Sequence, residues 1–274
     1  MAPNQENEIL NTREFEHISR LAFETCGIDL GAGKRELVQA RIGKKMRQGG
    51  FGSFKEYLRH VEADKTGQEL IALLDSLTTN FTSFLREPAH FEFLRNTILP
   101  GIRGEIRIWS AACSTGEEPF TIAFSLLEAL GNTDAQRIKI LASDLSTRVL
   151  ETAKAATYPA DRFTACPPRW LKDYLLRGTG QAEGLCRVKP AVRSLIEFRR
   201  WNLMETFNPP QPFHVIFCRN VMIYFDKETQ EGVVNRLATC LAPGGYLLVG
   251  HAESLTGLRH PYTYVKPAVY RKPL

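Results

Sequence analysis

The sequence predicts an α/β protein in which an all-helical N-terminal domain precedes a doubly wound, mostly parallel sheet. From residue 105, short runs rich in β-branched and aromatic residues alternate with helical patterns, as in a parallel sheet with helices on both faces. Residues 1–76 lack such runs, and their apolar residues recur at helical spacing. We therefore expect a helical domain at 1–77, a linker helix within 78–100 and the sheet domain at 101–274.

Apolar residues define three stretches of the helical domain. The segment GGFGS at 49–53 interrupts the pattern, because glycines break helices. Ser53 is expected to cap the next helix, since Glu56 follows three residues later as in a capping box. The residues that carry the pattern are Leu21, Phe23, Ile28, Leu37, Val38, Ile42 and Met46, then Phe54, Tyr57, Leu58 and Val61, and finally the run 70–77.

Six runs of residues are candidate strands of the sheet domain. The run at 213–220 is nearly all apolar, which is typical of a strand buried on both faces. The other candidates are 106–112, 139–143, 195–201, the strand after the turn in 242–250, and a final edge strand at 262–271. Helices are expected at 90–100, 119–130, 147–156 and 227–240.

An insertion at about 158–194 interrupts this alternation. Two short runs, 174–176 and 185–188, flank the glycine-rich segment RGTGQAEG. Strand-like runs on either side of a glycine-rich turn indicate a small hairpin or β-subdomain set into the larger domain.

The bulk composition indicates an ordinary globular protein. Hydrophobic residues make up 43% and charged residues 24%, and the net charge of +5 is too mild to indicate nucleic-acid binding. No apolar run is long enough for a membrane helix, and the first ten residues lack a secretory signal, so we expect a cytoplasmic protein. The six cysteines form no CxxC pair and the histidines have no ligand spacing, so no metal site is expected.

The segment 109–119 and Asp144 are the strongest signs of a cofactor site. Each follows a predicted strand, and ligands of doubly wound sheets bind beyond the carboxyl ends of the strands. Small residues in AACSTG allow close approach of the backbone, and Asp144 is placed to accept hydrogen bonds from ribose hydroxyls. These features indicate a Rossmann-like, nucleotide-binding domain.

Two acids in this segment argue against a phosphate-containing cofactor. Gly116 stands alone where a dinucleotide site needs three glycines, and Glu117 and Glu118 follow it at the start of the next helix. Negative charge there disfavours pyrophosphate and suits the ammonium and sulfonium of S-adenosylmethionine. The alternative is that both acids only complement the helix dipole, and which of them faces the cofactor stays open.

The motifs together resemble a known family. LTTNFTSFLRE, WSAACSTGEEPF, SDLS, WNLME, FCRNVMIYFD and LAPGGYLLVGHAESL are similar, in order and over nearly the whole chain, to the bacterial chemotaxis receptor methyltransferases, CheR. The resemblance implies an S-adenosylmethionine-dependent methyltransferase domain with a small β-subdomain behind a helical N-terminal domain. It further implies transfer of the methyl group to the γ-carboxylate of glutamates on chemoreceptors, giving methyl esters and S-adenosylhomocysteine.

The resemblance also implies roles for individual residues. Arg86 and Tyr224 match the residues nearest the transferring methyl group, and we expect them to orient the acceptor carboxylate without deprotonating anything. Arg86 can pair with a carboxylate of either the cofactor or the incoming glutamate. The implied cofactor contacts are Asn80, Thr82, Arg86, Glu117, Asp144, Asn202, Leu203, Arg219 and Asn220. For Arg219, the need for a partner favours a cleft surface over the core.

Two further segments are candidates for receptor recognition. Basic residues crowd 34–47, namely Lys34, Arg35, Arg41, Lys44, Lys45 and Arg47, and the expected substrate-binding residues are Lys34, Arg41, Lys44, Lys45 and Arg47. A basic helix would attract acidic receptor helices, although a merely solvated face is the alternative. The insertion resembles the β-subdomain that binds a receptor C-terminal pentapeptide in some members of the family, and a purely structural hairpin is the alternative.

Two other functions compete with receptor methylation. A methyltransferase acting on RNA or a small molecule would share the cofactor site, but the chain lacks a stripe of interleaved aromatic and basic residues for RNA. A binding module without activity would not need intact acids at 117 and 144. The sequence therefore favours an enzyme acting on chemoreceptors, with no nucleic-acid partner and no membrane insertion.

Overall fold

A computed structural model describes residues 9–78 and 81–274, which divide into two compact units. Unit 1 holds the described residues of Met1–Asn80 together with Tyr224–Thr229, and unit 2 holds Phe81–Ile223 and Gln230–Leu274. Asn80, one of the predicted cofactor contacts, lies outside the described residues. Among those described, every helix is too short or too polar to cross a lipid bilayer.

Unit 1 is helical, as the sequence predicts, but the first predicted stretch is divided in two because Gly27, with φ of 74°, ends its first helix. The helices of the unit are α1 (Thr12–Cys26), η2 (Ala32–Lys34), α2 (Arg35–Gln48), α3 (Phe54–Ala63) and α4 (Gln68–Leu77). The Ser53 hydroxyl accepts a hydrogen bond from the Glu56 amide at 3.2 Å, so the predicted cap of α3 is confirmed. The stripe Val38, Ile42 and Met46 is buried as expected, whereas Phe23 and Leu37 are exposed and do not belong to the core.

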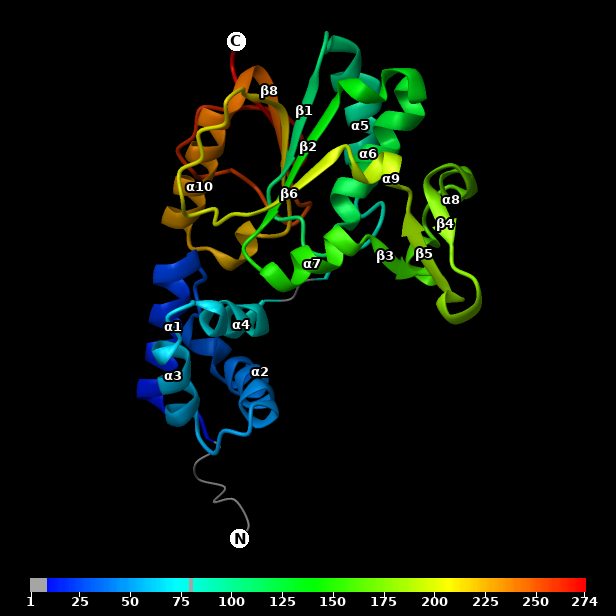
Figure 1. The fold of residues 1–274 in the computed structure, drawn as a ribbon. Coiled ribbons are helices and arrows are strands. Elements are labelled where there is room, and N and C mark those ends of the chain that lie inside the picture. The colour runs from blue at the N-terminus through cyan, green and yellow to red at the C-terminus, as the bar shows by residue number, and fades with distance from the viewer. Residues whose placement is uncertain (1–8, 79–80) are drawn as a thin grey trace. The chain divides into compact units, whose positions relative to one another are not determined.

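The main sheet of unit 2 has seven strands in the order β6-β2-β1-β7-β8-β10-β9 (Figure 1). The pairs from β6 to β8 are parallel, and β10 is antiparallel to both of its neighbours. The strands are β1 (Ile106–Ser110), β2 (Ile138–Asp144), β6 (Ile196–Arg200), β7 (Phe213–Cys218), β8 (Leu241–Val249), β9 (Thr263–Lys266) and β10 (Val269–Arg271). The single final strand predicted at 262–271 is therefore wrong, because a turn at Ala268, with φ of 61°, folds it into a hairpin.

Helices flank this sheet on both sides, with α6 and α5 on one side and α10 on the other in Figure 1. The helical segments are α5 (Ala89–Phe93), η3 (Leu94–Ile98), η4 (Leu99–Gly101), α6 (Glu117–Leu130), η5 (Asn132–Arg137), α7 (Thr147–Ala155), η8 (Met222–Tyr224) and α10 (Lys227–Cys240). The predicted amphipathic helix at 90–100 is present, with its middle π-helical, and it contributes Phe91, Leu94 and Ile98 to the core of unit 2.

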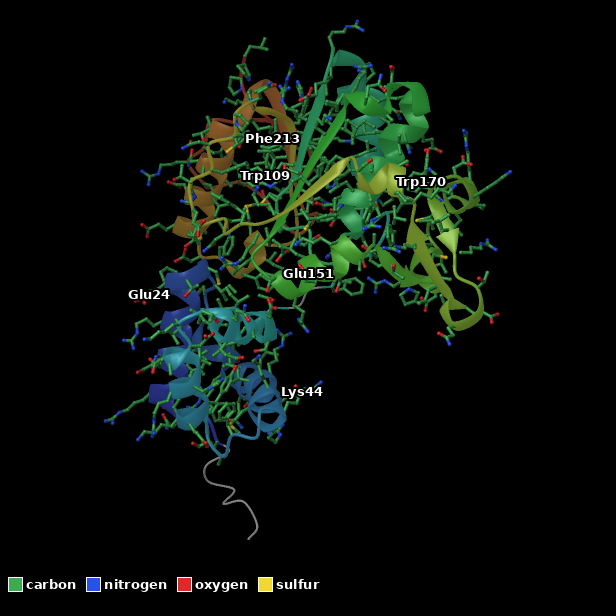
Figure 2. All side chains as sticks on the ribbon, viewed as in Figure 1. Glu24, Lys44, Trp109, Glu151, Trp170 and Phe213 are labelled. Atoms are coloured by element: carbon green, nitrogen blue, oxygen red, sulfur yellow. The ribbon has the colours of Figure 1, made fainter. Side chains whose placement is uncertain are left out.

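Large aromatic side chains pack adjacent segments of the sheet together and hold the insertion to helix α6. Trp109 of β1 packs against Phe213 of β7 with ring centroids 5.5 Å apart, and Figure 2 labels both within unit 2. Trp170 anchors the insertion by packing on Phe124 of α6 at 5.5 Å. Burial of such rings removes large apolar areas from water, so these contacts stabilise the packing of both regions.

The insertion forms a three-stranded antiparallel sheet in the order β3-β5-β4. Its elements are β3 (Thr157–Pro159), η6 (Ala160–Phe163), α8 (Pro168–Tyr174), β4 (Leu175–Arg177), η7 (Gly180–Ala182), β5 (Leu185–Val188) and α9 (Pro190–Arg193). The two predicted runs do pair as a hairpin, and β3 adds a third strand that the sequence did not indicate.

Candidate active site

The site lies where the sheet order reverses, at the adjacent carboxyl ends of β1, β2 and β7. The chain leaves β1 through a tight loop in which the Cys113 amide donates to the Ser143 carbonyl at 2.9 Å. Gly116 has φ of 99°, and a Cβ there would lie 2.8 Å from the Tyr158 hydroxyl oxygen, so only glycine fits. Glycine is therefore required here because the loop packs closely against Tyr158 and Ala153.

Asp144 at the end of β2 is held by two backbone amides. Its carboxylate oxygens accept from the Ser114 amide at 2.8 Å and the Ser146 amide at 3.0 Å. Ser114 has φ of 48°, so the loop after β1 takes a sparsely populated conformation to reach this carboxylate. This orientation leaves Asp144 half-buried at the edge of the site, which fits an acceptor for hydroxyl groups.

Glu117 begins α6 and is 1% exposed. One carboxylate oxygen accepts from the Thr115 hydroxyl at 2.6 Å, and the other forms a short ion pair with Arg162 of the insertion. The Glu117 carbonyl accepts from the Thr121 hydroxyl at 2.7 Å, and this hydroxyl in turn accepts from the Leu85 amide at 3.2 Å. The acid is thus fixed from both the loop and the helix.

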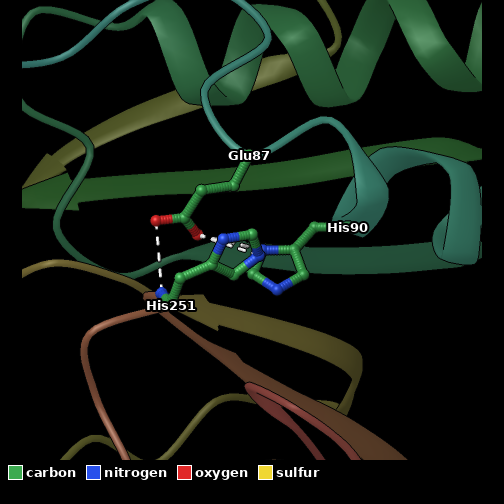
Figure 3. Close-up of side chains that lie close together, drawn as sticks. All are labelled: Glu87, His90 and His251. Atoms are coloured by element: carbon green, nitrogen blue, oxygen red, sulfur yellow. Dashed lines mark hydrogen bonds and ion pairs between the residues drawn. The ribbon is translucent and has the colours of Figure 1, made fainter.

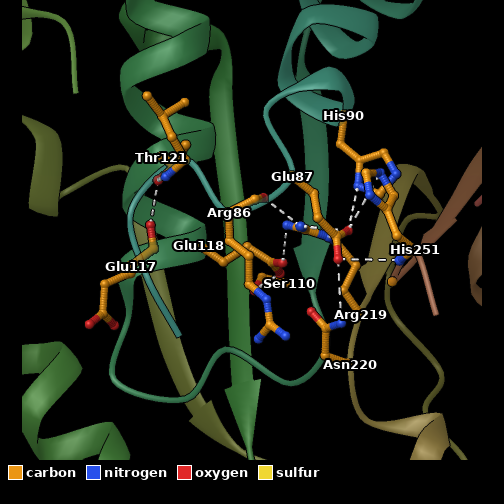
Figure 4. A network of polar contacts seen from close by, with 12 residues as sticks. Arg86, Glu87, His90, Ser110, Glu117, Glu118, Thr121, Arg219, Asn220 and His251 are labelled. Atoms are coloured by element: carbon orange, nitrogen blue, oxygen red, sulfur yellow. Dashed lines mark hydrogen bonds and ion pairs between the residues drawn. The ribbon is translucent and has the colours of Figure 1, made fainter. Parts of the chain in front are cut away.

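Arg219, directly after β7, is the centre of a buried ion cluster (Figure 4). Its side chain is 2% exposed and donates to Glu87 at 2.9 Å, to Glu118 at 2.9 Å and to the Arg86 carbonyl at 2.5 Å. The cleft-surface position expected for Arg219 is therefore wrong. A buried guanidinium is tolerated here because partners surround it, and its ring-face contact with Phe91 at 5.6 Å adds to them.

The two carboxylates of the cluster respond differently to their surroundings. At Glu87, burial opposes ionisation, but Arg219 outweighs it and holds the pKa below its ordinary value. At Glu118, burial prevails over Arg219 and raises the pKa. A Ser110 hydroxyl also donates to Glu118, at 2.7 Å. The two carboxylates thus share the single cation Arg219.

Arg86 lies on a strained segment that this cluster holds in place. Its neighbours Leu85 and Glu87 have φ of 55° and 60°, a region that side chains other than glycine rarely adopt. The hydrogen bond from Arg219 to the Arg86 carbonyl fixes the centre of the segment. The half-buried Arg86 side chain donates to the Phe81 carbonyl at 2.8 Å and remains at the edge of the site.

Asn220 and Glu253 complete the wall on the β7 side. Asn220 has φ of 58°, and its amide donates to the Glu253 carboxylate at 2.8 Å. Glu253 also accepts from the amides of Met222 at 2.8 Å and Gly250 at 2.6 Å. One buried carboxylate thus fixes the backbone of the FCRN segment, a role that the sequence did not reveal because its partners are some thirty residues away.

Asn202 and Leu203 follow β6 on the other side of the site. The Asn202 side-chain oxygen accepts from the Met204 amide at 3.0 Å, forming a local turn. The Leu203 carbonyl accepts from Arg236 at 3.1 Å, and Leu203 lines a small cavity together with Trp109 and Trp201. An amide and an apolar side chain therefore stand together after the third parallel strand, as predicted.

Glu87, His90 and His251 form a group of possible metal ligands (Figure 3), although the sequence predicts no metal site. Their ligand atoms lie within 4.8 Å of one another. Both Glu87 oxygens are already engaged, one by Arg219 and the other by the His251 amide at 3.2 Å. Burial and Arg219 lower the pKa of His90 to about 3. Because a cation would have to displace Arg219, we assign the group to the ion cluster.

The remaining predicted residues are divided between the two units, with Thr82 in unit 2 and the others in unit 1. Thr82 is buried, and its carbonyl accepts from Arg162 at 2.8 Å. Tyr224 belongs to unit 1, where its carbonyl accepts from the Asp29 amide at 2.8 Å. The predicted substrate-binding residues Lys34, Arg41, Lys44, Lys45 and Arg47 also belong to unit 1, on or just before α2.

Removing the cation from the cluster tests whether it holds the site together. We expect Arg219→Met to lower the free energy of unfolding by about 3–5 kcal/mol, because two buried carboxylates lose their counter-ion. Adding Glu118→Gln should recover part of the loss. Arg259→Met is the matched control, since Arg259 is 94% exposed and pairs with Glu231 at the surface. Equal effects of the two arginine substitutions in urea denaturation would contradict the role of the cluster.

Comparison with known proteins identifies the family. Residues 80–270 match the CheR methyltransferase S-adenosylmethionine-binding domain, and residues 13–78 match the CheR all-alpha domain. The chain is 41% identical to a chemotaxis protein methyltransferase of Salmonella typhimurium, over 95% of this chain and 90% of that protein. It is 40% identical to chemotaxis protein methyltransferase 2 of Pseudomonas aeruginosa, over 94% and 93%. The chain belongs to the CheR family of S-adenosylmethionine-dependent methyltransferases.

Proposed function

We propose that this chain transfers the methyl group of S-adenosylmethionine to the γ-carboxylate of specific glutamates on cytoplasmic helices of chemoreceptors. The observation that carries the proposal is that the loop after β1 and helix α6 together link both acids to the segment of Arg86. The Ser114 amide donates to Asp144, and the Thr121 hydroxyl connects the Glu117 carbonyl with the amide of Leu85, the neighbour of Arg86. The acids suit a cationic nucleoside, and the arginine suits an acidic acceptor. A cytoplasmic location follows from the proposed substrate.

The cofactor contacts follow from the chemistry of each side chain. Glu117 binds the ammonium group, and Asp144 binds the ribose hydroxyls. Asn202 and Leu203 bind the edge and face of the adenine. Thr82, Asn80 and Asn220 add polar contacts to the amino acid part. For Arg219 we assign a positioning role, because its donors are engaged by Glu87, Glu118 and the Arg86 carbonyl.

The proposed reaction needs no general base. S-adenosylmethionine supplies an electrophilic methyl group, and a glutamate carboxylate with an ordinary pKa of about 4.3 is already a nucleophile at neutral pH. The protein must align the carboxylate with the methyl group and exclude water. Arg86 and Tyr224 orient the carboxylate, and the strained backbone on either side of Arg86 limits the positions that its side chain can take.

The direct test is incubation of the protein with labelled S-adenosylmethionine and receptor-enriched membranes. Base-labile label on the receptors is expected, since carboxyl methyl esters hydrolyse in alkali. Arg86→Lys and Tyr224→Phe should each lower kcat by about 10- to 1000-fold, the range for losing an oriented contact in the transition state. Unchanged turnover in both variants would overturn the orienting role. Label on RNA or a small molecule alone would overturn the proposed substrate.

Basic side chains of α2 are proposed to attract the acidic receptor helices. Arg41 donates to the Leu77 carbonyl at 2.5 Å and Lys34 to the Asp29 carbonyl at 2.8 Å, so both are partly engaged within unit 1. Lys44 is exposed, and Lys45 lies 3.9 Å from Glu69. We infer that the part of α2 around Lys44 contributes most to the attraction.

Charge reversal tests this attraction. Lys44→Glu with Lys45→Glu should raise KM for receptor roughly 3- to 30-fold at low salt and flatten its dependence on salt concentration. Lys55→Glu on α3, another exposed lysine of unit 1, is the control and should leave both unchanged. A KM that stays the same in the double variant would rule out steering by α2.

The β-subdomain is proposed to bind the C-terminal pentapeptide of a receptor by strand addition. Among the described strands, β4 stands at an edge of the small sheet beside β5, and Leu176 on it is 48% exposed. Titration with a receptor C-terminal peptide should give saturable binding that Leu176→Asp weakens. Lys172→Asp on the neighbouring helix α8 serves as the control. Absence of binding by the unchanged protein would leave the subdomain a purely structural hairpin.

A further inference from the structure

Arg162 stands beside Glu117 and was not indicated by any sequence motif. It lies on η6, in the first turn of the insertion, and its Nη2 atom donates both to the Glu117 carboxylate and to the Thr82 carbonyl. Its side chain is 37% exposed, whereas that of Glu117 is 1% exposed. The guanidinium of the pair is therefore partly accessible to solvent, whereas its carboxylate is buried.

The position of Arg162 is fixed by its neighbours. Phe163 stacks on Phe84 with ring centroids 4.2 Å apart, and both rings are 1% exposed. Tyr158, at the start of the same segment, donates from its hydroxyl to the Thr115 carbonyl at 2.6 Å. Two buried anchors on either side thus hold Arg162 against the loop that carries Glu117.

A guanidinium and a carboxylate side by side have the chemistry to bind an α-amino acid. The ammonium of such a ligand pairs with the acid, and its carboxylate pairs with the guanidinium through a charge-assisted hydrogen bond. Among the contacts of residues 9–78 and 81–274, Nε and Nη1 of Arg162 have no protein partner. These donors remain for a ligand carboxylate.

We propose that Arg162 binds the α-carboxylate of S-adenosylmethionine while Glu117 binds its α-ammonium. The inference rests on the proposed placement of Glu117. It leaves Arg86 for the glutamate of the receptor, so the two arginines divide the two carboxylates of the reaction between them. It also gives the insertion a part in cofactor binding, separate from any receptor peptide.

Three ligands test the assignment by calorimetry. They are S-adenosylmethionine, its decarboxylated form, which keeps the ammonium and the sulfonium but loses the carboxylate, and 5′-methylthioadenosine, which lacks the whole amino acid part and with it the sulfonium charge. Each is titrated into the whole protein and into Arg162→Met, Glu117→Gln and Arg169→Met. Arg169 is the matched control, an arginine of the same insertion that is 72% exposed and pairs with Asp173.

Arg162→Met should weaken binding of S-adenosylmethionine roughly 10- to 100-fold, the effect of one charge-assisted contact. Its affinity for the decarboxylated form should change by less than about 3-fold. Arg169→Met should change neither. Methylthioadenosine should bind all variants alike, which shows that the pocket has folded.

Two results would overturn the assignment. Equal weakening of both charged ligands by Arg162→Met would mean that Arg162 only positions Glu117, and no weakening would mean that it does not face the cofactor. A different variant, Glu117→Gln, shows whether the proposed placement of the cofactor at Glu117 is itself wrong. In that case Glu117→Gln would bind S-adenosylmethionine as tightly as the unchanged protein, whatever Arg162→Met does.

Discussion

The buried guanidinium of Arg219 is the interaction on which the geometry of the site depends. It joins three segments that are far apart in the sequence, namely the loop at 86–87, the start of α6 at Glu118 and the end of β7. A buried cation is costly unless several acceptors surround it. Here the acceptors are Glu87 and the Arg86 carbonyl from the loop and Glu118 from α6. The cation therefore ties the helical side of unit 2 to the centre of its sheet.

This constraint explains why backbone strain gathers around the site. Leu85, Glu87 and Asn220 all have positive φ, and each lies beside a group that Arg219 or Glu253 holds. Such conformations cost on the order of 1–3 kcal/mol each and persist only where the surroundings fix them. The hydrogen bonds of Arg219 hold the strained segment on either side of Arg86, and those of Glu253 hold the strained backbone at Asn220.

The repeating parts of the fold could be predicted from the sequence, whereas the ion cluster could not. Periodic patterns indicate helices and strands because they depend on residues three, four or two positions apart. Glu87 lies 132 residues from Arg219, so no local pattern relates them, and the need for a partner suggested a cleft surface. The hairpin at 263–271 was predicted as a single strand because apolar residues alternate throughout it. Nothing in that pattern indicates that Ala268 takes the left-handed conformation that turns the chain.

The two acids after Gly116 show what a sequence pattern leaves open and geometry decides. Consecutive residues on a helix point about 100° apart, so Glu117 and Glu118 cannot face the same partner. Glu118 turns toward Ser110 and Arg219, and each of its carboxylate oxygens accepts a hydrogen bond from one of them. Glu117 turns toward Arg162, whose side chain is 37% exposed. Glu118 therefore belongs to the buried framework of the site, whereas the partner of Glu117 is accessible to solvent, which is the basis for proposing Glu117 as the acid that meets the cofactor.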